Sequence, residues 1–326
     1  MKKSLIRGML ALLAGVATSA VWGLAPTVAT SPDGLNKIEL ARKDGVVKIT
    51  ASRRGDGTMV STFAGLAYLD SDKGPDPKRD DILSVSTSRT TGVRKTPVYK
   101  RAEISLADCR TRVSFERGWG IELAARNDGV AYRFETKMPG RIRVNCEKAV
   151  VNVPEAGLRS CAYRTSRFGC EEAVPTVGRI GDISHEGPGH KMVYLPLTYT
   201  LSDDTTVAVT DADVRDYPVW YMKRVESGEG IRLESVFAGW PKKTHRAGGG
   251  DSKTAIASGG RWVRVDEHAD YLVETDGTRT FPWRAFVLGD APKALCESDL
   301  VQALSSPRAN LDFSWVKPGK VAWDWW

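Results

Sequence analysis

Three carboxylates stand close together in the segment TDADVRDYP, namely Asp211, Asp213 and Asp216. Carboxylate oxygens are the ligands that hard cations such as calcium prefer. Three acidic residues within this short segment could therefore form a weak divalent-cation site, although turn and capping roles are commoner for such residues. Calcium takes about six to eight oxygen ligands, so one carboxylate could not hold it unaided.

Other residue types that perform catalysis or bind metals show no useful spacing. The adjacent Glu171 and Glu172 make a poor acid/base pair, because neighbours on a strand point to opposite faces. No GxSxG sequence occurs, so a Ser-His-Asp mechanism has no nucleophile elbow. The histidines lie in polar, loop-like segments, which favours surface positions over a zinc site; they are His185, His190, His245 and His268.

The five cysteines allow disulfides if the chain is exported. Cys161 and Cys170 enclose a short loop that contains a glycine, and they are the favoured pair. Cys109 and Cys146 form an alternative pair that would join neighbouring strands. The odd number leaves at least one free thiol, most simply Cys296.

Composition indicates a folded protein and excludes one class of partner. The chain has 326 residues, of which 41% are hydrophobic and 27% charged, so it can bury a sizeable core in one large domain or two ordinary ones. Its net charge of +7 is spread along the chain. No basic stripe with interleaved aromatic residues occurs, so we expect no nucleic-acid binding.

The N-terminus has the pattern of an export signal. Lys2, Lys3 and Arg7 precede the apolar run 9–22, and small residues follow at a suitable cleavage position. Residues 1–23 are therefore predicted to be a signal peptide, and the mature chain is predicted to be periplasmic or extracellular. An uncleaved membrane anchor is the weaker alternative. After cleavage we expect no membrane association, because no later segment is long and apolar enough to span a bilayer.

Short segments that alternate apolar and polar residues recur at the spacing of an all-β domain. The predicted strands include 46–51, 111–115, 120–125, 130–136, 149–153, 193–201, 206–210 and 231–237. Turn signals such as Asp33-Gly34 and Asp276-Gly277 lie between strands. Only one stretch, 293–305, is predicted to be helical, because its apolar residues fall on one helical face. The pattern predicts a large β-sandwich with a short C-terminal helix.

Several short motifs follow one another in a fixed order. They are SPDG at 31–34, DGVAYRF at 128–134, DYP at 216–218, PWR at 282–284, and SWVKPGK at 314–320 leading into WDWW at 323–326. Any one of them is weak evidence. The whole series resembles the N-terminal region of glycoside hydrolase family 97, a family of exported α-glucosidases and α-galactosidases. The resemblance covers about residues 30–326.

The resemblance implies a domain architecture and a location for the catalytic residues. Residues 24–310 would form a β-super-sandwich, and residues 311–326 would be the linker and first strand of a (β/α)8 barrel that is missing from this sequence. The family's catalytic carboxylates lie in that barrel, so no catalytic residue is assigned here and the chain is expected to be inactive alone. One strand cannot close a barrel, so we expect 311–326 to be poorly ordered or loosely packed on the sandwich.

The resemblance also assigns roles to particular residues. Asp211 matches a glutamate that supplies a calcium ligand in the family. Asp keeps the carboxylate that calcium prefers but is shorter, so we expect calcium in the intact enzyme and no stable binding by this chain. The substrate-stacking residues implied by the resemblance are Trp323, Trp325 and Trp326. Arg284 is interpreted either as a domain-packing residue or as part of a surface ion pair, and Trp220 and Tyr221 either as core or as lining of the barrel boundary.

Two classes of function therefore remain open. In the first, the chain is the N-terminal part of an enzyme that hydrolyses α-glycosidic bonds, and its partners are an α-glucoside or α-galactoside oligosaccharide and a separately encoded barrel domain. In the second, it is a non-catalytic exported module that binds carbohydrate or has a structural role.

Overall fold

The computed structural model describes residues 26–322 except 44–45, 55–56, 65–67, 70–73, 77–78, 97–98, 155–156, 167–173, 179, 181–182, 188–189, 226–230, 248–261, 308–311, 313 and 318. The predicted signal peptide and the three terminal tryptophans therefore lie outside the described residues. Among the described residues, no helix is long and apolar enough to cross a membrane.

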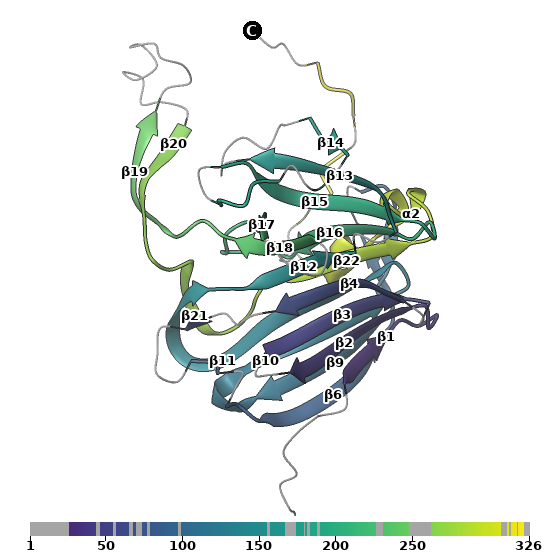
Figure 1. Ribbon diagram of the computed structural model, residues 1–326, viewed down its shortest axis with the longest axis horizontal. Helices are drawn as coiled ribbons and strands as arrows, with labels where there is room; N and C mark the ends of the chain where they lie inside the picture. The colour runs from purple at the N-terminus through teal and green to yellow at the C-terminus, as the bar shows by residue number, and fades with distance from the viewer. Residues whose placement is uncertain are drawn as a thin grey trace, which may run out of the picture.

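Most of the chain forms one large antiparallel sheet, folded so that two runs of strands face each other (Figure 1). In order of pairing, the first run contains β1 (Thr27–Thr30), β2 (Asn36–Lys43), β3 (Val46–Arg53), β4 (Gly57–Ala64), β12 (Ala149–Val153), β18 (Ile231–Val236) and β17 (Tyr221–Val225). The second contains β6 (Ile82–Thr90), β9 (Asp108–Phe115), β10 (Trp119–Arg126), β11 (Gly129–Cys146), β22 (Trp283–Gly289), β16 (Thr206–Ala212), β15 (Met192–Leu201), β13 (Leu158–Ser166) and β14 (Thr176–Val177).

One strand pairing joins these two runs, and the second run is extended by two further strands. A short pairing between β15 and β17 joins them directly. The long strand β11 curves along one side of the molecule (Figure 1), and its second half pairs with β21 (Val273–Thr280) and β5 (Tyr68–Leu69). Strands β9 and β10 are joined by the 3₁₀ turn η1 (Glu116–Gly118). These pairings confirm the predicted all-β sandwich.

The core lies between the two runs, because alternate residues of each strand point inward. Ile38 of β2 and Ile49 of β3 come from the first run, and Ile121 of β10 and Phe286 of β22 from the second; all four are fully buried. The segments predicted as strands are strands, with bounds that differ by a few residues, except that β11 continues to Cys146, well beyond the predicted 130–136. Period-two alternation therefore located these strands correctly.

The opposite face of the second run is also covered. Alanines on β10, β11, β16 and β22 line it, and Leu300 and Leu304 of a short helix pack on them. Small side chains allow a helix to approach the sheet closely, so the alanines and the helix are complementary. The covered residues of the sheet are Ala124, Ala131, Ala208, Ala212, Trp283, Ala285 and Val287.

The single helix predicted over 293–305 is wrong in one respect. The structure has two short helices, α2 (Lys293–Glu297) and α3 (Leu300–Leu304), separated by Ser298 and Asp299. The carboxylate of Asp128 accepts hydrogen bonds from the Ser298 hydroxyl (3.0 Å) and the Asp299 amide (2.8 Å). These contacts hold the break to the turn between β10 and β11, and a helical pattern in the sequence cannot reveal such a tertiary contact.

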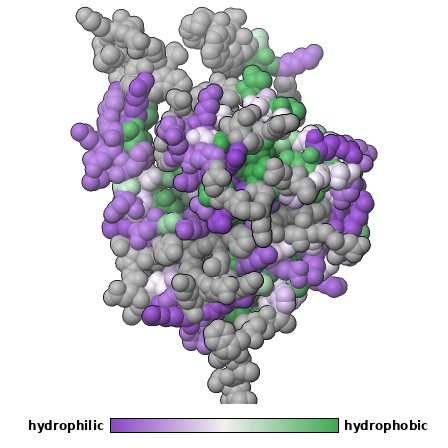
Figure 2. Space-filling model, viewed as in Figure 1, coloured by the Kyte–Doolittle hydropathy of each residue, from purple (hydrophilic) through white to green (hydrophobic). Residues whose placement is uncertain are grey.

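Two small hairpins stand apart from the main sheet. Hairpin β7 (Val93–Lys95) with β8 (Glu103–Ser105) reaches the short helices, where Arg94 donates to the carbonyls of Gln302 and Ser305. Hairpin β19 (Pro241–Ala247) with β20 (Trp262–His268) extends away from the body (Figure 1). Its surface is mostly hydrophilic (Figure 2), although Val263 is 65% exposed.

The segment predicted to enter a barrel is described only in part, at 312, 314–317 and 319–322. These residues form no strand, and nearly all are exposed. Trp315, from the SWVKPGK motif, is 76% exposed. The expectation of loose packing over 311–326 otherwise stays a prediction, as do the domain boundaries.

Candidate functional site

Asp211 is the penultimate residue of β16, directly opposite Arg284 on β22. Val207 and Val209 of the same strand point into the core, and alternation places Asp211 on that inner side, where the strand ends. Its side chain is 17% exposed. The sequence therefore places this carboxylate at the rim of the core, with limited access to solvent.

Arg284 lies beside it and is almost completely buried. Its Nε and Nη2 donate to the two carboxylate oxygens of Glu147 at 2.8 and 2.7 Å, and both side chains are 1% exposed. Nη1 lies 3.9 Å from Oδ2 of Asp211. Both sequence-based interpretations of Arg284 are corrected, because the guanidinium forms a bidentate ion pair inside the sandwich. Sequence reasoning missed Glu147, which lies in the loop between β11 and β12 and belongs to no recognisable motif.

Aromatic rings enclose the guanidinium of Arg284. The ring centroids of Trp220 and Phe237 lie 5.1 and 5.2 Å from its central carbon, and that of Tyr217 lies at 6.0 Å. Desolvation opposes the charged form, but the negative charge of Glu147 outweighs it and raises the pKa of Arg284 above its usual value. Burial, reinforced by Glu147, also raises the pKa of Tyr217 well above its ordinary value. Arg284 therefore stays positively charged although it is buried.

The described residues do not fit a calcium site on their own. Both oxygens of Glu147 are engaged by Arg284, and Asp211 faces the same cation. Across the described part of the chain, no three His, Cys, Asp or Glu side chains gather as a metal would require. A calcium ion would need about six to eight oxygens, so Asp211 could serve only with ligands from elsewhere.

Asp213 and Asp216 shape the turn that follows β16. Both adopt positive φ, 55° and 47°, which Asp tolerates better than most residues. Asp213 accepts hydrogen bonds from Nε of Arg215 (3.1 Å) and from the hydroxyl of Ser306. The alternative of turn and capping roles is therefore confirmed for Asp213, and the three aspartates do not converge on one point.

Several other sequence interpretations can be compared with the structure. Trp220 and Tyr221 are 0% and 5% exposed, which confirms the core interpretation. The four histidines are exposed, as predicted. Cys109 and Cys146 carry free thiols, so they are not paired with each other. Cys161 is buried in β13 and likewise carries a free thiol in the structure. Its predicted partner Cys170 lies outside the described residues, so the pairing of Cys161 with Cys170 stays a prediction.

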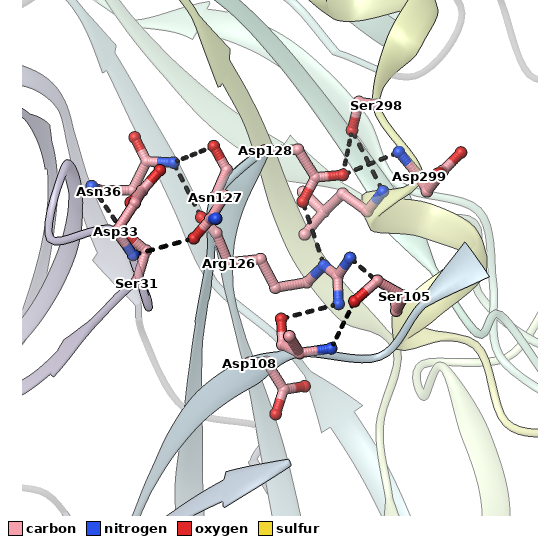
Figure 3. A network of polar contacts seen from close by, with 12 residues as sticks. Ser31, Asp33, Asn36, Ser105, Asp108, Arg126, Asn127, Asp128, Ser298 and Asp299 are labelled. Atoms are coloured by element: carbon pink, nitrogen blue, oxygen red, sulfur yellow. Dashed lines mark hydrogen bonds and ion pairs between the residues drawn. The ribbon is translucent and has the colours of Figure 1, made fainter. Parts of the chain in front are cut away.

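The first two sequence motifs meet in one polar network (Figure 3). In SPDG, Ser31 donates to Asp33 (2.6 Å), and the backbone amide of Asp33 donates to the side chain of Asn127 (3.1 Å). In DGVAYRF, Asp128 accepts from Arg126 (3.1 Å) and from the break between the two helices. Asp33 therefore ties its turn to the turn between β10 and β11, and Asp128 ties that turn to the C-terminal helices.

Two further motif residues meet on the helix-covered face. Arg133 of DGVAYRF forms an ion pair with Glu122 (2.6 Å), and its guanidinium lies 4.3 Å from the ring centroid of Trp283 of PWR. Gly129 approaches β22 so closely that a Cβ there would lie 2.3 Å from the carbonyl oxygen of Phe286. Residues of the motifs DGVAYRF and PWR therefore pack β11 closely against β22.

A cavity of about 280 Å³ borders the buried ion pair. Its walls include Glu147 and Glu234, as well as Lys148, Lys223 and Phe237. Both carboxylates already have cationic partners, since Glu147 binds Arg284 and Glu234 binds Arg232 at 2.9 Å. Neither is poised as a free acid or base at this cavity.

Comparison with solved structures shows the same fold in larger enzymes. A glycoside hydrolase family 97 enzyme from Pseudoalteromonas sp. strain K8 superposes with a TM-score of 0.69 at 19% identity, over 90% of this chain and 40% of that one. A β-arabinopyranosidase superposes with a TM-score of 0.66 at 15% identity, over 88% of this chain and 44% of that one.

Sequence comparisons give closer relationships. A retaining alpha-galactosidase from Bacteroides thetaiotaomicron is 30% identical over 239 residues, which are 71% of this chain and 34% of the relative. A probable retaining alpha-galactosidase from Streptomyces bingchenggensis is 38% identical over 56 residues, 17% of this chain and 9% of that one. The chain thus spans about a third of the length of the Bacteroides relative. Residues 29–307 match the family model described as glycosyl-hydrolase 97 N-terminal, and the chain therefore belongs to that family.

Proposed function

We propose that this chain is the N-terminal sandwich of an exported α-glycosidase that acts on α-galactosides or α-glucosides. The observation that carries the proposal is the match over 71% of this chain to a retaining alpha-galactosidase of which it spans 34%. Related family 97 structures contain acarbose and panose, which are oligosaccharide ligands of those proteins. Export follows from the signal-like residues 1–23.

The sandwich by itself is expected not to hydrolyse glycosides. Hydrolysis requires two carboxyl groups about 5–10 Å apart across the scissile bond, one of them able to donate a proton. The carboxylates that line the described cavity are held by arginines instead. The proposed role of the sandwich is therefore to present a rigid rim to a catalytic barrel, with Asp211 at the end of β16 supplying one calcium ligand to a site that the barrel completes.

The test is hydrolysis of aryl α-galactosides and aryl α-glucosides by the purified chain, with and without the remaining portion of the Bacteroides relative as a separate polypeptide. We expect no turnover by the chain alone and turnover only in the mixture. Bovine serum albumin in place of the chain controls for nonspecific stabilisation of the added portion. Hydrolysis by the chain alone would contradict its proposed inactivity.

A non-catalytic carbohydrate-binding role is the second candidate, and two exposed tryptophans favour it. Trp240 is 44% and Trp315 76% exposed, and flat aromatic surfaces stack on sugar rings. The predicted stacking residues Trp323, Trp325 and Trp326 lie outside the described residues. Titration with maltose-type and galactose-type oligosaccharides should quench tryptophan fluorescence, and less so in Trp240→Ala and Trp315→Ala. A flat titration of the wild-type chain would exclude this role.

A further inference from the structure

Strand β6 is an open edge of the large sheet. Among the strands that the structure describes, it pairs with β9 alone, and it lies along the lower border of the molecule in Figure 1. An edge strand presents unpaired backbone amides and carbonyls, which can pair with another chain. Every residue between its two ends is exposed. The strand is therefore accessible along most of its length.

Natural proteins usually protect such an edge with lysines, acidic residues, proline, or a bulge. The sequence of β6, ILSVSTSRT, contains none of these residue types, and Arg89 is its single charged residue. A register irregularity lies between Ile82 and Ser84, but the ladder from Ser84 to Thr90 continues without interruption. Leu83 is 67% and Val85 48% exposed. The strand is thus nearly neutral and partly apolar.

We propose that β6 pairs antiparallel with β6 of a second copy of this chain, with the two Val85 residues opposite each other. Antiparallel pairing of a strand with itself about a two-fold axis is self-complementary. Val85 lies opposite the fully buried Val113 of β9, so the pairing would extend the hydrophobic core across the axis. Ser84, Ser86 and Ser88 would fall on the polar face and need no cover.

Charge supports the second copy as the occupant of this edge. With the two Val85 residues opposite each other, Arg89 at one end of β6 would lie close to the other copy's Asp81, which precedes the irregularity at Ile82–Ser84. Within the described part of the chain, neither side chain has an ion-pair partner of its own. Each dimer would therefore gain two ion pairs at the ends of the shared ladder.

The other exposed ribbon is less suited to pairing with itself. In the hairpin β19–β20, Lys242 and His245 are paired with Glu267 and Asp266. Three further cations, Lys243, Arg246 and Arg264, have no carboxylate partner among the described residues. Two such hairpins would repel each other, because like charges placed opposite each other are destabilising.

Sedimentation equilibrium of the full chain tests the proposal. The wild-type chain should be a reversible dimer, and Val85→Lys should raise its dissociation constant by about tenfold or more, because it places two lysines opposite each other. The matched control is Val177→Lys, at a position on the short strand β14 that is 75% exposed. Circular dichroism and thermal unfolding establish that both variants fold.

Charge reversal tests the register. Arg89→Asp and Asp81→Arg should each weaken the dimer, and the double variant should restore it, since the two charges then exchange places. A wild-type chain that stays monomeric at every concentration overturns the proposal. So does a dimer that responds no more to Val85→Lys than to Val177→Lys. Failure of the double variant to recover would overturn the proposed register.

Discussion

At the scale of single residues, the ion pair between Arg284 and Glu147 is almost completely buried. Two hydrogen bonds below 2.9 Å join the side chains, and the rings of Trp220 and Phe237 exclude water from them. A buried pair is not necessarily stabilising compared with apolar residues, but removing one partner leaves an uncompensated charge in a dry site. Single and double substitutions should therefore behave very differently.

We expect Arg284→Met to lower the free energy of unfolding by about 3–5 kcal/mol, because the carboxylate of Glu147 remains buried without its partner. The double variant Arg284→Met with Glu147→Leu should recover much of that loss, as both charges are then gone. Urea denaturation gives the free energy of unfolding of the wild-type chain, the single variant and the double variant. The control, Lys242→Ala, breaks an exposed pair with Glu267 and should change the free energy of unfolding little. A double variant no more stable than Arg284→Met would contradict this account.

Thiol counting tests the predicted disulfide between Cys161 and Cys170. Burial raises the pKa of the Cys161 thiol to about 12, so a free Cys161 should react very slowly with a disulfide reagent in the folded chain at neutral pH. In denaturant without reductant, the chain should show two fewer thiols than its five cysteines if the pair forms. Reaction of all five thiols would show that the prediction is wrong.

At the scale of elements, the turn between β10 and β11 organises a distant part of the chain. Asp128 in that turn binds the junction of α2 and α3, and Arg126 reaches the carbonyls of Ser105 and Ala107 at 3.0 and 3.1 Å. One turn therefore fixes the C-terminal helices and the segment before β9. The motif DGVAYRF, which served in the sequence only as part of the family resemblance, therefore has a structural role here.

Asp128→Ala should lower the free energy of unfolding by about 1–3 kcal/mol, because it leaves partly buried donors unsatisfied. It should also increase amide hydrogen exchange in α2 and α3 more than in the central strands, as the helices lose their attachment. The control is Asp276→Ala on β21, whose side chain is 80% exposed and should matter little. Uniform exchange across the whole chain would indicate a general loss of stability instead.

At the scale of the whole molecule, the two runs of strands enclose several phenols. Tyr132, Tyr199 and Tyr217 are buried at 0%, 1% and 9% exposure, and burial raises the pKa of each. The folded state therefore holds these protons more tightly than the unfolded state. Their contribution to stability is fully present below the pKa of an unfolded tyrosine, about 10, and is lost as the pH rises above it.

We expect these three phenols to ionise only as the chain unfolds at alkaline pH, when phenolate absorbance and circular dichroism are followed together. The chain unfolded in urea provides the reference in which all nine tyrosines titrate. Tyr132→Phe should reduce the loss of stability above about pH 10. It should change stability little at neutral pH, since no hydrogen bond to the hydroxyl is found in the described structure. If all tyrosines ionised reversibly while circular dichroism still showed a folded chain, that result would contradict the burial of these three phenols.

Local sequence patterns were sufficient for the fold class, most of the strands and the family. Alternation with period two is a local property, because each strand residue faces either the core or the other side whatever strand lies next to it. The motifs are also local, since each is a short run of residues and their order is that of the chain, so they indicate the family without knowledge of which strands pair.

The roles of the motif residues depend instead on the tertiary structure. Glu147 lies 137 positions before Arg284, and Asp128 lies 171 positions before Asp299, so no local pattern could reveal either contact. The same distance in sequence explains why one helix was predicted where there are two, and why Arg284 was interpreted as a domain-packing residue or as part of a surface ion pair. Burial and partnership depend on which strands pair, and that pairing is settled only when the whole core closes.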